Sequence, residues 1–304
     1  MESPESAAER LHGALFGKNR EETTLEIITN NNLERRLEIA KAYGQAYKNP
    51  LYEDMKSKLS GHFKELAGYV FLTPYEYDAK MLKRGFKGLS VDETLIFEIL
   101  CCHTQEEYRK IEEAYKVETK KELSKDIDKN FSGSLKKNLL NILHVPRRVN
   151  TNPDKGRCEE LADRLISAGE GNWVNDDNLF REVFIECSAH ELVLISRFYF
   201  QKTGNNIIDI IEKKCSGKNK TLLREILFGT VIPHELYAEK IRGAIKGLGT
   251  NNAVLNRVLA SRCNVDMDEI KEIYPFKYKI TLKEDIEGDT SGMYQKLCLY
   301  LARC

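Results

Sequence analysis

Apolar residues recur along the chain at spacings of three and four positions, the period of an amphipathic α-helix. Two stretches show the pattern well, with apolar residues at Leu95, Ile96, Ile99 and Leu100, and at Ile241, Ala244 and Ile245. Thr73-Pro74 and Ile232-Pro233 each place a proline where a helix can begin, because the N–H that proline lacks has no partner in a first turn. No stretch requires a strand, so the pattern predicts an all-α protein.

One frame occurs four times: Ile-x-x-x-Tyr, followed 18 residues after the tyrosine by the glycine of a Ser-Gly pair. The four sets are Ile39/Tyr43/Gly61, Ile111/Tyr115/Gly133, Ile195/Tyr199/Gly217 and Ile270/Tyr274/Gly292. Each Ile and Tyr lie one helical turn apart, which predicts a shared buried face. The glycines are 72, 84 and 75 residues apart, a regularity that indicates an internal repeat, and the apolar pattern within each unit predicts about five short helices.

The frame divides the chain into four repeats. We expect repeat I at residues 1–73, repeat II at 74–144, repeat III at 157–231 and repeat IV at 232–304. Residues 145–156 (VPRRVNTNPDKG) have the proline, asparagine and glycine content of a linker, and this insertion accounts for the longest glycine separation. The repeats therefore form two pairs.

Composition limits the classes of partner. Lysine plus arginine and aspartate plus glutamate both number 47, so no overall field attracts nucleic acid. The first ten residues lack the apolar core of a signal peptide, and no apolar run approaches the roughly 20 residues of a membrane span. Eight cysteines without a Cys-x-x-Cys pair, two of them adjacent at Cys101 and Cys102, indicate reduced buried thiols. These features predict a cytosolic protein.

The histidines do not suggest catalysis. Six are scattered along the chain without a carboxylate or serine at a recognisable spacing, and no nucleophile motif is present. The glycine-containing loops also lack the pattern of a phosphate-binding loop, because no Gly-x-x-x-x-Gly-Lys-Ser/Thr occurs. We expect that the protein is not an enzyme.

Candidate chemistry is concentrated in repeat IV. The segment Ile245-Lys246-Gly247-Leu248-Gly249-Thr250 links two predicted helices, and Asp289 stands 40 residues after Gly249. Glycines allow backbone carbonyls to turn toward one point, and Ca²⁺ accepts such oxygens together with a carboxylate more readily than Mg²⁺ does. The alternative from the residues alone is that the glycines end one helix and Asp289 caps the next.

These residues, with the four repeats, resemble the annexin family over essentially the whole chain. The resemblance implies an all-α, slightly curved disc whose convex loops bind Ca²⁺ and anionic phospholipid at the cytoplasmic face of a membrane. It implies carbonyl ligands at Ile245, Gly247 and Gly249 and a carboxylate ligand at Asp289. A Ca²⁺ bridge acts locally, which agrees with a balanced net charge. The family resemblance also suggests cytoskeletal partners and self-association on membranes.

The other repeats depart from the family pattern. Repeat I has Lys58 and repeat III has Lys214 at the carboxylate position, where an ammonium cannot bind Ca²⁺. Repeat II has a neutral amide there, so we expect a weaker metal site with ligands at Phe86, Gly88, Ser90 and Asn130. Repeat IV itself has Asn251 and Asn252 in place of two acids, which should lower its Ca²⁺ affinity. Such divergence resembles plant or protist annexins, with the α-giardins as one candidate group.

Three residues are candidates for contact with lipid. Lys58 and Lys214 would attract anionic headgroups without metal, each contributing about 1 kcal/mol, or would be solvated loop lysines. Trp173, in a polar loop, is expected to be exposed and to enter the membrane interface. The main alternative function is a calcium-independent cytoskeletal or protein adaptor that uses the surface of the helical repeats.

Overall fold

The computed structural model describes residues 2–88, 90–101, 103–247 and 249–304. Within these ranges the chain forms helices joined by loops and contains no β-strand, which confirms the predicted fold class. The chain divides into two compact units, one made of Met1–Tyr77 and His234–Cys304 and the other of Asp78–Pro233. None of the described helices is both long enough and apolar enough to cross a membrane.

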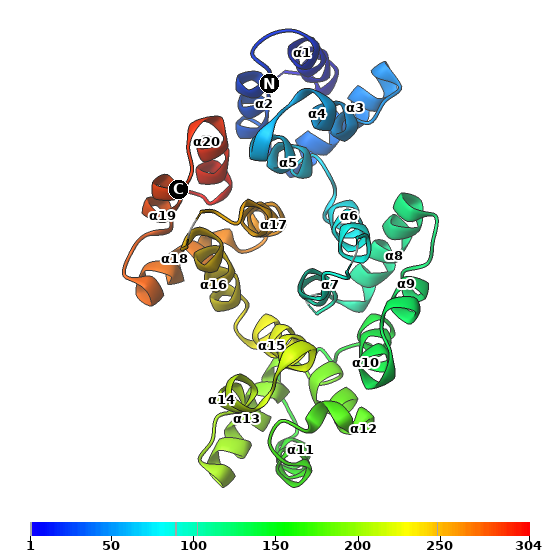
Figure 1. Ribbon diagram of the computed structural model, residues 1–304, viewed down its shortest axis with the longest axis vertical. Helices are drawn as coiled ribbons and strands as arrows, with labels where there is room; N and C mark the ends of the chain where they lie inside the picture. The colour runs from blue at the N-terminus through cyan, green and yellow to red at the C-terminus, as the bar shows by residue number, and fades with distance from the viewer. Residues whose placement is uncertain (1, 89, 102, 248) are drawn as a thin grey trace. The chain divides into compact units, whose positions relative to one another are not determined.

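The first unit joins the two ends of the chain (Figure 1). Its N-terminal helices are α1 (Pro4–Phe16), α2 (Arg20–Thr29), α3 (Leu33–Tyr47), α4 (Leu51–Lys58) and α5 (Gly61–Tyr69). Its C-terminal helices are α16 (Pro233–Ile245), α17 (Asn252–Arg262), α18 (Met267–Tyr278), α19 (Leu282–Asp289) and α20 (Gly292–Leu301). Helix α5 packs against α17 and α20, and a single hydrophobic core contains buried residues from both ends of the chain.

The second unit contains the middle of the chain. Its first helices are α6 (Pro74–Phe86), α7 (Glu93–Leu100), α8 (Gln105–Thr119), α9 (Leu123–Asn130) and α10 (Gly133–His144). After the helix-free residues 145–154 come α11 (Lys155–Ala168), the 3₁₀ turn η1 (Trp173–Asn175), α12 (Asp177–Phe180), the π-helical turn η2 (Arg181–Ile185), α13 (Ala189–Thr203), α14 (Ile207–Lys214) and α15 (Gly217–Val231). Where repeat II has the single helix α7, repeat III therefore has three short helical pieces.

Local sequence signals explain where the helices begin. Pro74 and Pro233 occupy the first positions of α6 and α16, as predicted. Reciprocal capping boxes start α8, α13 and α19, with the pairs Thr104/Glu107, Ser188/Glu191 and Thr281/Glu284. The four repeated glycines, which begin α5, α10, α15 and α20, have φ between +55° and +64°. This left-handed backbone favours glycine and explains why the residue recurs there.

The repeated Ile and Tyr residues lie in the core, as the sequence predicts. All eight side chains are at most 1% exposed. In three repeats the tyrosine hydroxyl also donates a hydrogen bond to an aspartate 11 residues later, in the first turn of the next helix. The pairs are Tyr43–Asp54 at 2.7 Å, Tyr115–Asp126 at 2.7 Å and Tyr274–Asp285 at 2.6 Å. Burial, together with the neighbouring aspartate, raises the pKa of each of these three tyrosines, so the phenol keeps the proton that it donates.

Repeat III lacks this hydrogen bond. Tyr199 is buried in the same way, but the residue 11 positions later is Ile210, which is also buried. The third and fourth helices of this repeat are therefore held together by apolar packing at a place where the other repeats have a buried polar pair.

No disulfide bond is recorded for the seven described cysteines. Six of the seven are buried, as predicted, whereas Cys304 at the end of the chain is exposed. Cys102, half of the adjacent pair noted in the sequence, lies outside the described residues.

The tyrosine–aspartate pairs lead to a stability prediction. Tyr274→Phe removes the hydroxyl donor from the buried carboxylate of Asp285 and should lower the free energy of unfolding by about 1–2 kcal/mol. Tyr199→Phe is the matched control, because it removes the same atom from a repeat without the aspartate and should cost less. Equilibrium urea denaturation measures both, and an equal loss in the two variants would contradict the role given to the pair.

Candidate functional site

Asp285 links three helices of repeat IV. Its carboxylate, 8% exposed, lies in the first turn of α19 and accepts the hydrogen bond from Tyr274 of α18. The guanidinium of Arg242, in the last turn of α16, forms an ion pair with the same carboxylate oxygen. The end of α16 is therefore tied to the start of α19, which places the loop after α16 next to the fourth helix of the repeat.

The loop between α16 and α17 is open and exposed. The N–H of Asn251 donates to the carbonyl of Ala244 at 2.7 Å, which closes the loop at its base. Gly247 and Gly249 are exposed, whereas the side chain of Ile245 is buried in the core. Gly249 has φ +90°, in the left-handed region that favours glycine. Leu248, the middle residue of the motif, lies outside the described residues.

Asp289 lies beside this loop although 40 residues separate them in sequence. The hydroxyl of Thr250 is 2.5 Å from a carboxylate oxygen of Asp289 and 3.0 Å from its backbone carbonyl oxygen. Asp289 is the last residue of α19, one turn after Asp285, so the contacts of Asp285 also fix where Asp289 lies. A partly exposed carboxylate thus adjoins a glycine-containing loop, as the sequence predicts for repeat IV.

The helix dipole makes this carboxylate unusual. The C-terminal end of a helix carries partial negative charge, so an acid there is unfavourable by about 0.3–1 kcal/mol. Helix α19 has no basic residue in its last turn, whereas the corresponding helices α4, α9 and α14 do. Those basic residues are Lys56 and Lys58, Lys129, and Lys213 and Lys214. Among these four helices, only the end of α19 has the charge that would favour a bound cation.

Repeat II has the same backbone hydrogen bond at the base of its loop as repeat IV, but it lacks the carboxylate. The N–H of Asp92 donates to the carbonyl of Gly85 at 2.9 Å, as Asn251 does to Ala244 in repeat IV. The side-chain amide of Asn130 donates back to the carbonyl of Asp126 at 2.8 Å. Leu89, within the same loop, lies outside the described residues.

A cavity of about 280 Å³ is lined in part by Phe86 and Asn130. Four lysines but only two carboxylates line it, so its electrostatics favour an anion over Ca²⁺. Gly88 has no side chain and the hydroxyl of Ser90 carries no charge, and both residues are exposed.

The two lysines at vacated acid positions differ in their surroundings. Lys58 is partly exposed, and its ammonium lies 4.5 Å from the centre of the Phe16 ring. Lys214 is exposed, and its ammonium is 4.0 Å from a carboxylate oxygen of Glu170, at the limit of an ion pair. Such an exposed pair at the distance limit contributes little, so the ammonium of Lys214 stays available to other anions.

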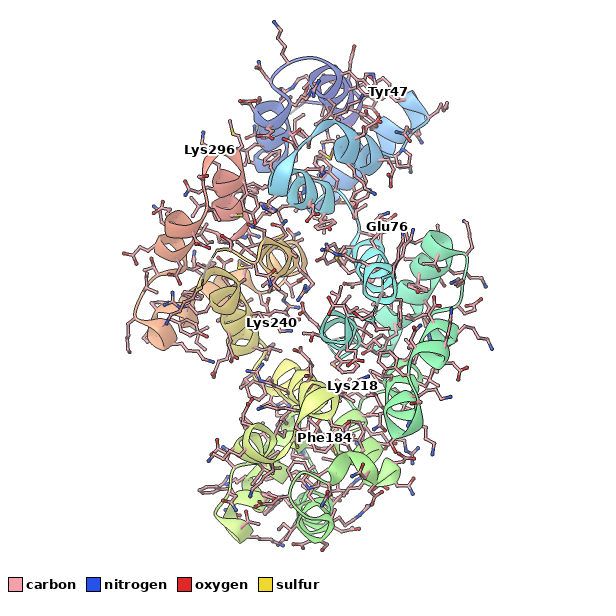
Figure 2. The ribbon with its side chains drawn as sticks, in the orientation of Figure 1. Tyr47, Glu76, Phe184, Lys218, Lys240 and Lys296 are labelled. Carbon is pink, nitrogen blue, oxygen red and sulfur yellow. The ribbon has the colours of Figure 1, made fainter. Side chains whose placement is uncertain are left out.

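The predicted exposure of Trp173 is wrong in this structure. The indole is fully buried, and its ring N–H donates to the carbonyl of Leu165 at 2.9 Å. It packs against Tyr199 and Phe184, with ring centres 5.9 and 6.0 Å away (Phe184 is labelled in Figure 2). The polar sequence of the loop gave no signal for this, because the residues that contact the ring come from other segments, α11, η2 and α13. Trp173 is a core residue.

The described residues contain no group of three or more histidine, cysteine, aspartate or glutamate side chains placed to hold a metal ion. A site built from backbone carbonyls and one carboxylate would not form such a group. Sequence reasoning missed the contacts of Asp285 with Arg242 and Tyr274. The available signal was an aspartate 11 residues after the repeated tyrosine in three of the four repeats.

Comparison with known proteins shows that most of the chain is similar in sequence to annexins. The annexin family model matches residues 6–67, 77–142 and 237–301, more than half of the chain, and these ranges leave out repeat III. Human annexin A13 is 32% identical over 295 residues, covering 97% of this chain and 93% of the relative. Annexin A1 of Equus caballus is 33% identical over 304 residues, covering 98% of this chain and 87% of the relative.

Solved structures show the same fold. Annexin III superposes with a TM-score of 0.91 at 32% identity, covering 99% of this chain and 94% of that chain. A calcium-bound annexin (Sm)1 has a TM-score of 0.83 at 25% identity, with coverage of 99% and 90%. Calcium-bound α-14 giardin has a TM-score of 0.83 at 16% identity, with 99% of each chain covered, a likeness of fold alone.

The burial of Trp173 can be tested directly because the chain has a single tryptophan. We expect the emission of the calcium-free, lipid-free protein to be blue-shifted from that of a solvated indole and to resist quenching by iodide. Urea-unfolded protein is the control, in which iodide should quench the indole freely. Equal quenching before and after unfolding would contradict the buried position.

Proposed function

The chain belongs to the annexin family, whose members bind phospholipids in a calcium-dependent way, and on this premise we propose that repeat IV carries its calcium-dependent attachment to anionic membranes. The observation that carries the proposal is the position of Asp289, at the dipole-negative end of α19 and in contact with Thr250 of the loop. A carboxylate at the negative end of a helix dipole favours a cation, and among the four corresponding helix ends only that of α19 lacks a basic residue in its last turn.

The proposed ligands are the backbone carbonyls of Ile245, Gly247 and Gly249 and the carboxylate of Asp289. When bound there, Ca²⁺ would bridge these oxygens to lipid phosphate and offset the repulsion between acid and headgroup. The chain's own contribution is position: Arg242 and Tyr274 hold Asp285, and Asp285 fixes the turn that ends in Asp289. The space beside both loop glycines is open, since a Cβ at Gly247 or Gly249 would have no neighbour within 4 Å.

We propose that the other repeats contribute little calcium binding. Repeat II has Asn130 bonded to its own helix and a surplus of lysines around Phe86. Repeats I and III place Lys58 and Lys214 at helix ends, where they would attract headgroups directly. On this proposal, weak metal-independent attraction accompanies one metal-dependent contact.

We also propose a cellular location for this activity. It would attach reversibly to the cytoplasmic face of a membrane, and it could link that membrane to cytoskeletal proteins or self-associate there. Annexins are generally not enzymes, and we propose no catalytic role for this chain. The rival function is a calcium-independent adaptor, which is favoured by the loss of the acid from three of the four positions.

The central test is cosedimentation with phosphatidylserine vesicles across a calcium titration. Asp289→Asn keeps the size of the side chain but removes its charge, and it should raise the calcium concentration for half-maximal pelleting by at least tenfold. The matched control is Asp268→Asn, which removes one charge from a side chain that is 66% exposed on α18. Identical titrations for Asp289→Asn and the unmodified protein would reject the repeat IV site and favour the adaptor.

The unfolding stability of Asp289→Asn in chelator shows whether a loss of pelleting comes from lost metal binding or from misfolding. Because Asp289 opposes the dipole of α19, Asp289→Asn should leave the calcium-free protein at least as stable, by up to about 1 kcal/mol. Urea denaturation in chelator checks this, and a clear destabilisation would mean that lost pelleting has a structural cause.

The lysines make a separate prediction for vesicle binding in chelator. Lys58→Gln combined with Lys214→Gln should weaken this binding roughly tenfold or more, given about 1 kcal/mol per lysine, and 0.5 M salt should abolish the difference. Lys41→Gln combined with Lys155→Gln is the control, since these exposed residues lie on α3 and α11, away from the fourth-helix ends. If both double variants bind alike, Lys58 and Lys214 are ordinary solvated lysines.

A further inference from the structure

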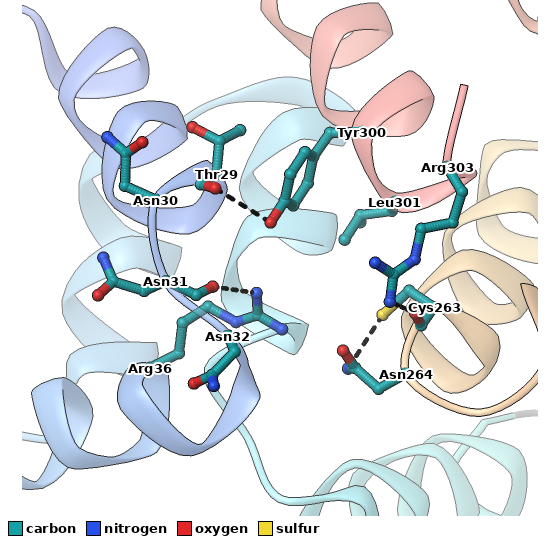
Figure 3. A pocket seen from close by; sticks show the side chains of 10 residues that line it. All are labelled: Thr29, Asn30, Asn31, Asn32, Arg36, Cys263, Asn264, Tyr300, Leu301 and Arg303. Carbon is teal, nitrogen blue, oxygen red and sulfur yellow. Dashed lines mark hydrogen bonds between the residues drawn. The ribbon is translucent and has the colours of Figure 1, made fainter.

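A second polar site lies within the first unit, apart from the loop of repeat IV. A cavity of about 200 Å³ is enclosed by the α2–α3 connection, the start of the α17–α18 connection and the end of α20 (Figure 3). Two arginines and four asparagines line it, together with a tyrosine and a threonine, and none of the ten lining residues is an acid. A cavity with positive charge and many donors favours an anionic ligand.

The side chain of Arg36 forms the buried wall of this cavity. It is 2% exposed, its Nε donates to the carbonyl of Val70 at 2.9 Å, and one terminal nitrogen donates to the carbonyl of Asn31 at 2.9 Å. The other terminal nitrogen is buried without any hydrogen-bond partner. In Figure 3 this nitrogen points across the cavity toward Cys263 and Asn264. A buried guanidinium with unused donors is costly, so it calls for an acceptor.

The charge of Arg36 is also uncompensated. Neither Arg36 nor Arg303 forms an ion pair with a carboxylate among the described residues, although both line the cavity. Burial lowers the pKa of Arg36; Cys263 and Tyr300 oppose this shift in part, and the nearby positive charge of Arg303 adds to it. Arg303 is itself exposed and donates one hydrogen bond to the carbonyl of Cys263 at 2.8 Å.

A purely structural role accounts for only part of this arrangement. Arg36 donates to carbonyls at the end of α2 and just after α5, and a cation is favourable at helix C-termini. That role uses Nε and one terminal nitrogen. It explains neither the unpartnered second nitrogen nor the placement of a second arginine on the same cavity.

We propose that this cavity binds a phosphate group, with Arg36 contacting it from the buried side and Arg303 from the exposed side. Guanidinium groups match the tetrahedral oxygens of phosphate with paired N–H donors. Asn32 is a further candidate donor, because its side-chain oxygen already accepts from the N–H of Arg35 and its amide nitrogen remains for a ligand. The site is independent of calcium and of the membrane attachment proposed for repeat IV.

Isothermal titration with inorganic phosphate in chelator, at constant ionic strength, tests the site. The unmodified protein should bind in the millimolar range or tighter, and Arg303→Gln should weaken binding by about tenfold or more. Arg109→Gln is the matched control, because it removes the same charge from an exposed helical residue of the second unit and should bind as the unmodified protein does. Titration is preferred to a melting shift, since phosphate stabilises proteins non-specifically.

A second variant tests the buried arginine. Arg36→Lys keeps the charge but loses the paired donors, and it should also weaken phosphate binding while its urea transition shows whether the fold survives. The proposal is overturned if the unmodified protein shows no phosphate binding up to tens of millimolar. It is equally overturned if Arg303→Gln and Arg109→Gln bind phosphate alike.

A parallel experiment with phosphatidic acid vesicles in chelator distinguishes a lipid phosphate from a soluble one. If Arg303→Gln loses vesicle binding as well as inorganic phosphate, the site recognises a lipid phosphate. If Arg303→Gln loses only inorganic phosphate, the ligand is a soluble phosphate or phosphate monoester. Both results support the site, because each depends on Arg303.

Discussion

The hydrogen bond between the repeated tyrosine and the aspartate 11 residues later is the interaction on which the rest of each regular repeat depends. It joins the third helix to the first turn of the fourth in repeats I, II and IV. The fourth helix has only eight residues, too short to be stable alone, so a buried polar anchor in its first turn determines where its last turn lies. In repeat IV, Arg242 adds a connection to the first helix. The position of Asp289 follows from these contacts.

Repeat III shows what replaces the anchor when it is lost. Ile210 takes the place of the aspartate, and the second helix is broken into 3₁₀, α and π turns. Arginines of the preceding linker contact the end of this irregular segment and the start of α13: Arg147 donates to the carbonyls of Phe184 and Cys187, and Arg148 pairs with Glu191 at 3.0 Å. The buried Trp173 fills the interior of the same repeat. The annexin family model leaves out this repeat, which agrees with its altered internal contacts.

The charge at the end of the fourth helix distinguishes repeat IV from the other repeats. Lysine at that position agrees with the helix dipole and stabilises the helix without any ligand, as in α4 and α14. Aspartate opposes the dipole, so a cation near the end of α19 would be favourable. On the function that we propose, a lysine in place of the aspartate at this position would exchange a metal-dependent contact with an anionic surface for a direct electrostatic one.

The sequence by itself determined the fold class, the four repeats, the buried Ile and Tyr faces and the helix starts at Pro74 and Pro233. These features depend on local periodicity and on backbone preferences that residues a few positions apart express. It also indicated the pairing of the α16–α17 loop with Asp289, through the family resemblance. Only the tertiary structure decided that Trp173 is buried, that Arg242 and Tyr274 share Asp285, and that Arg36 and Arg303 line one cavity. The residues involved lie between 8 and 267 positions apart in sequence, and packing of separate helices, not local sequence, brings them together.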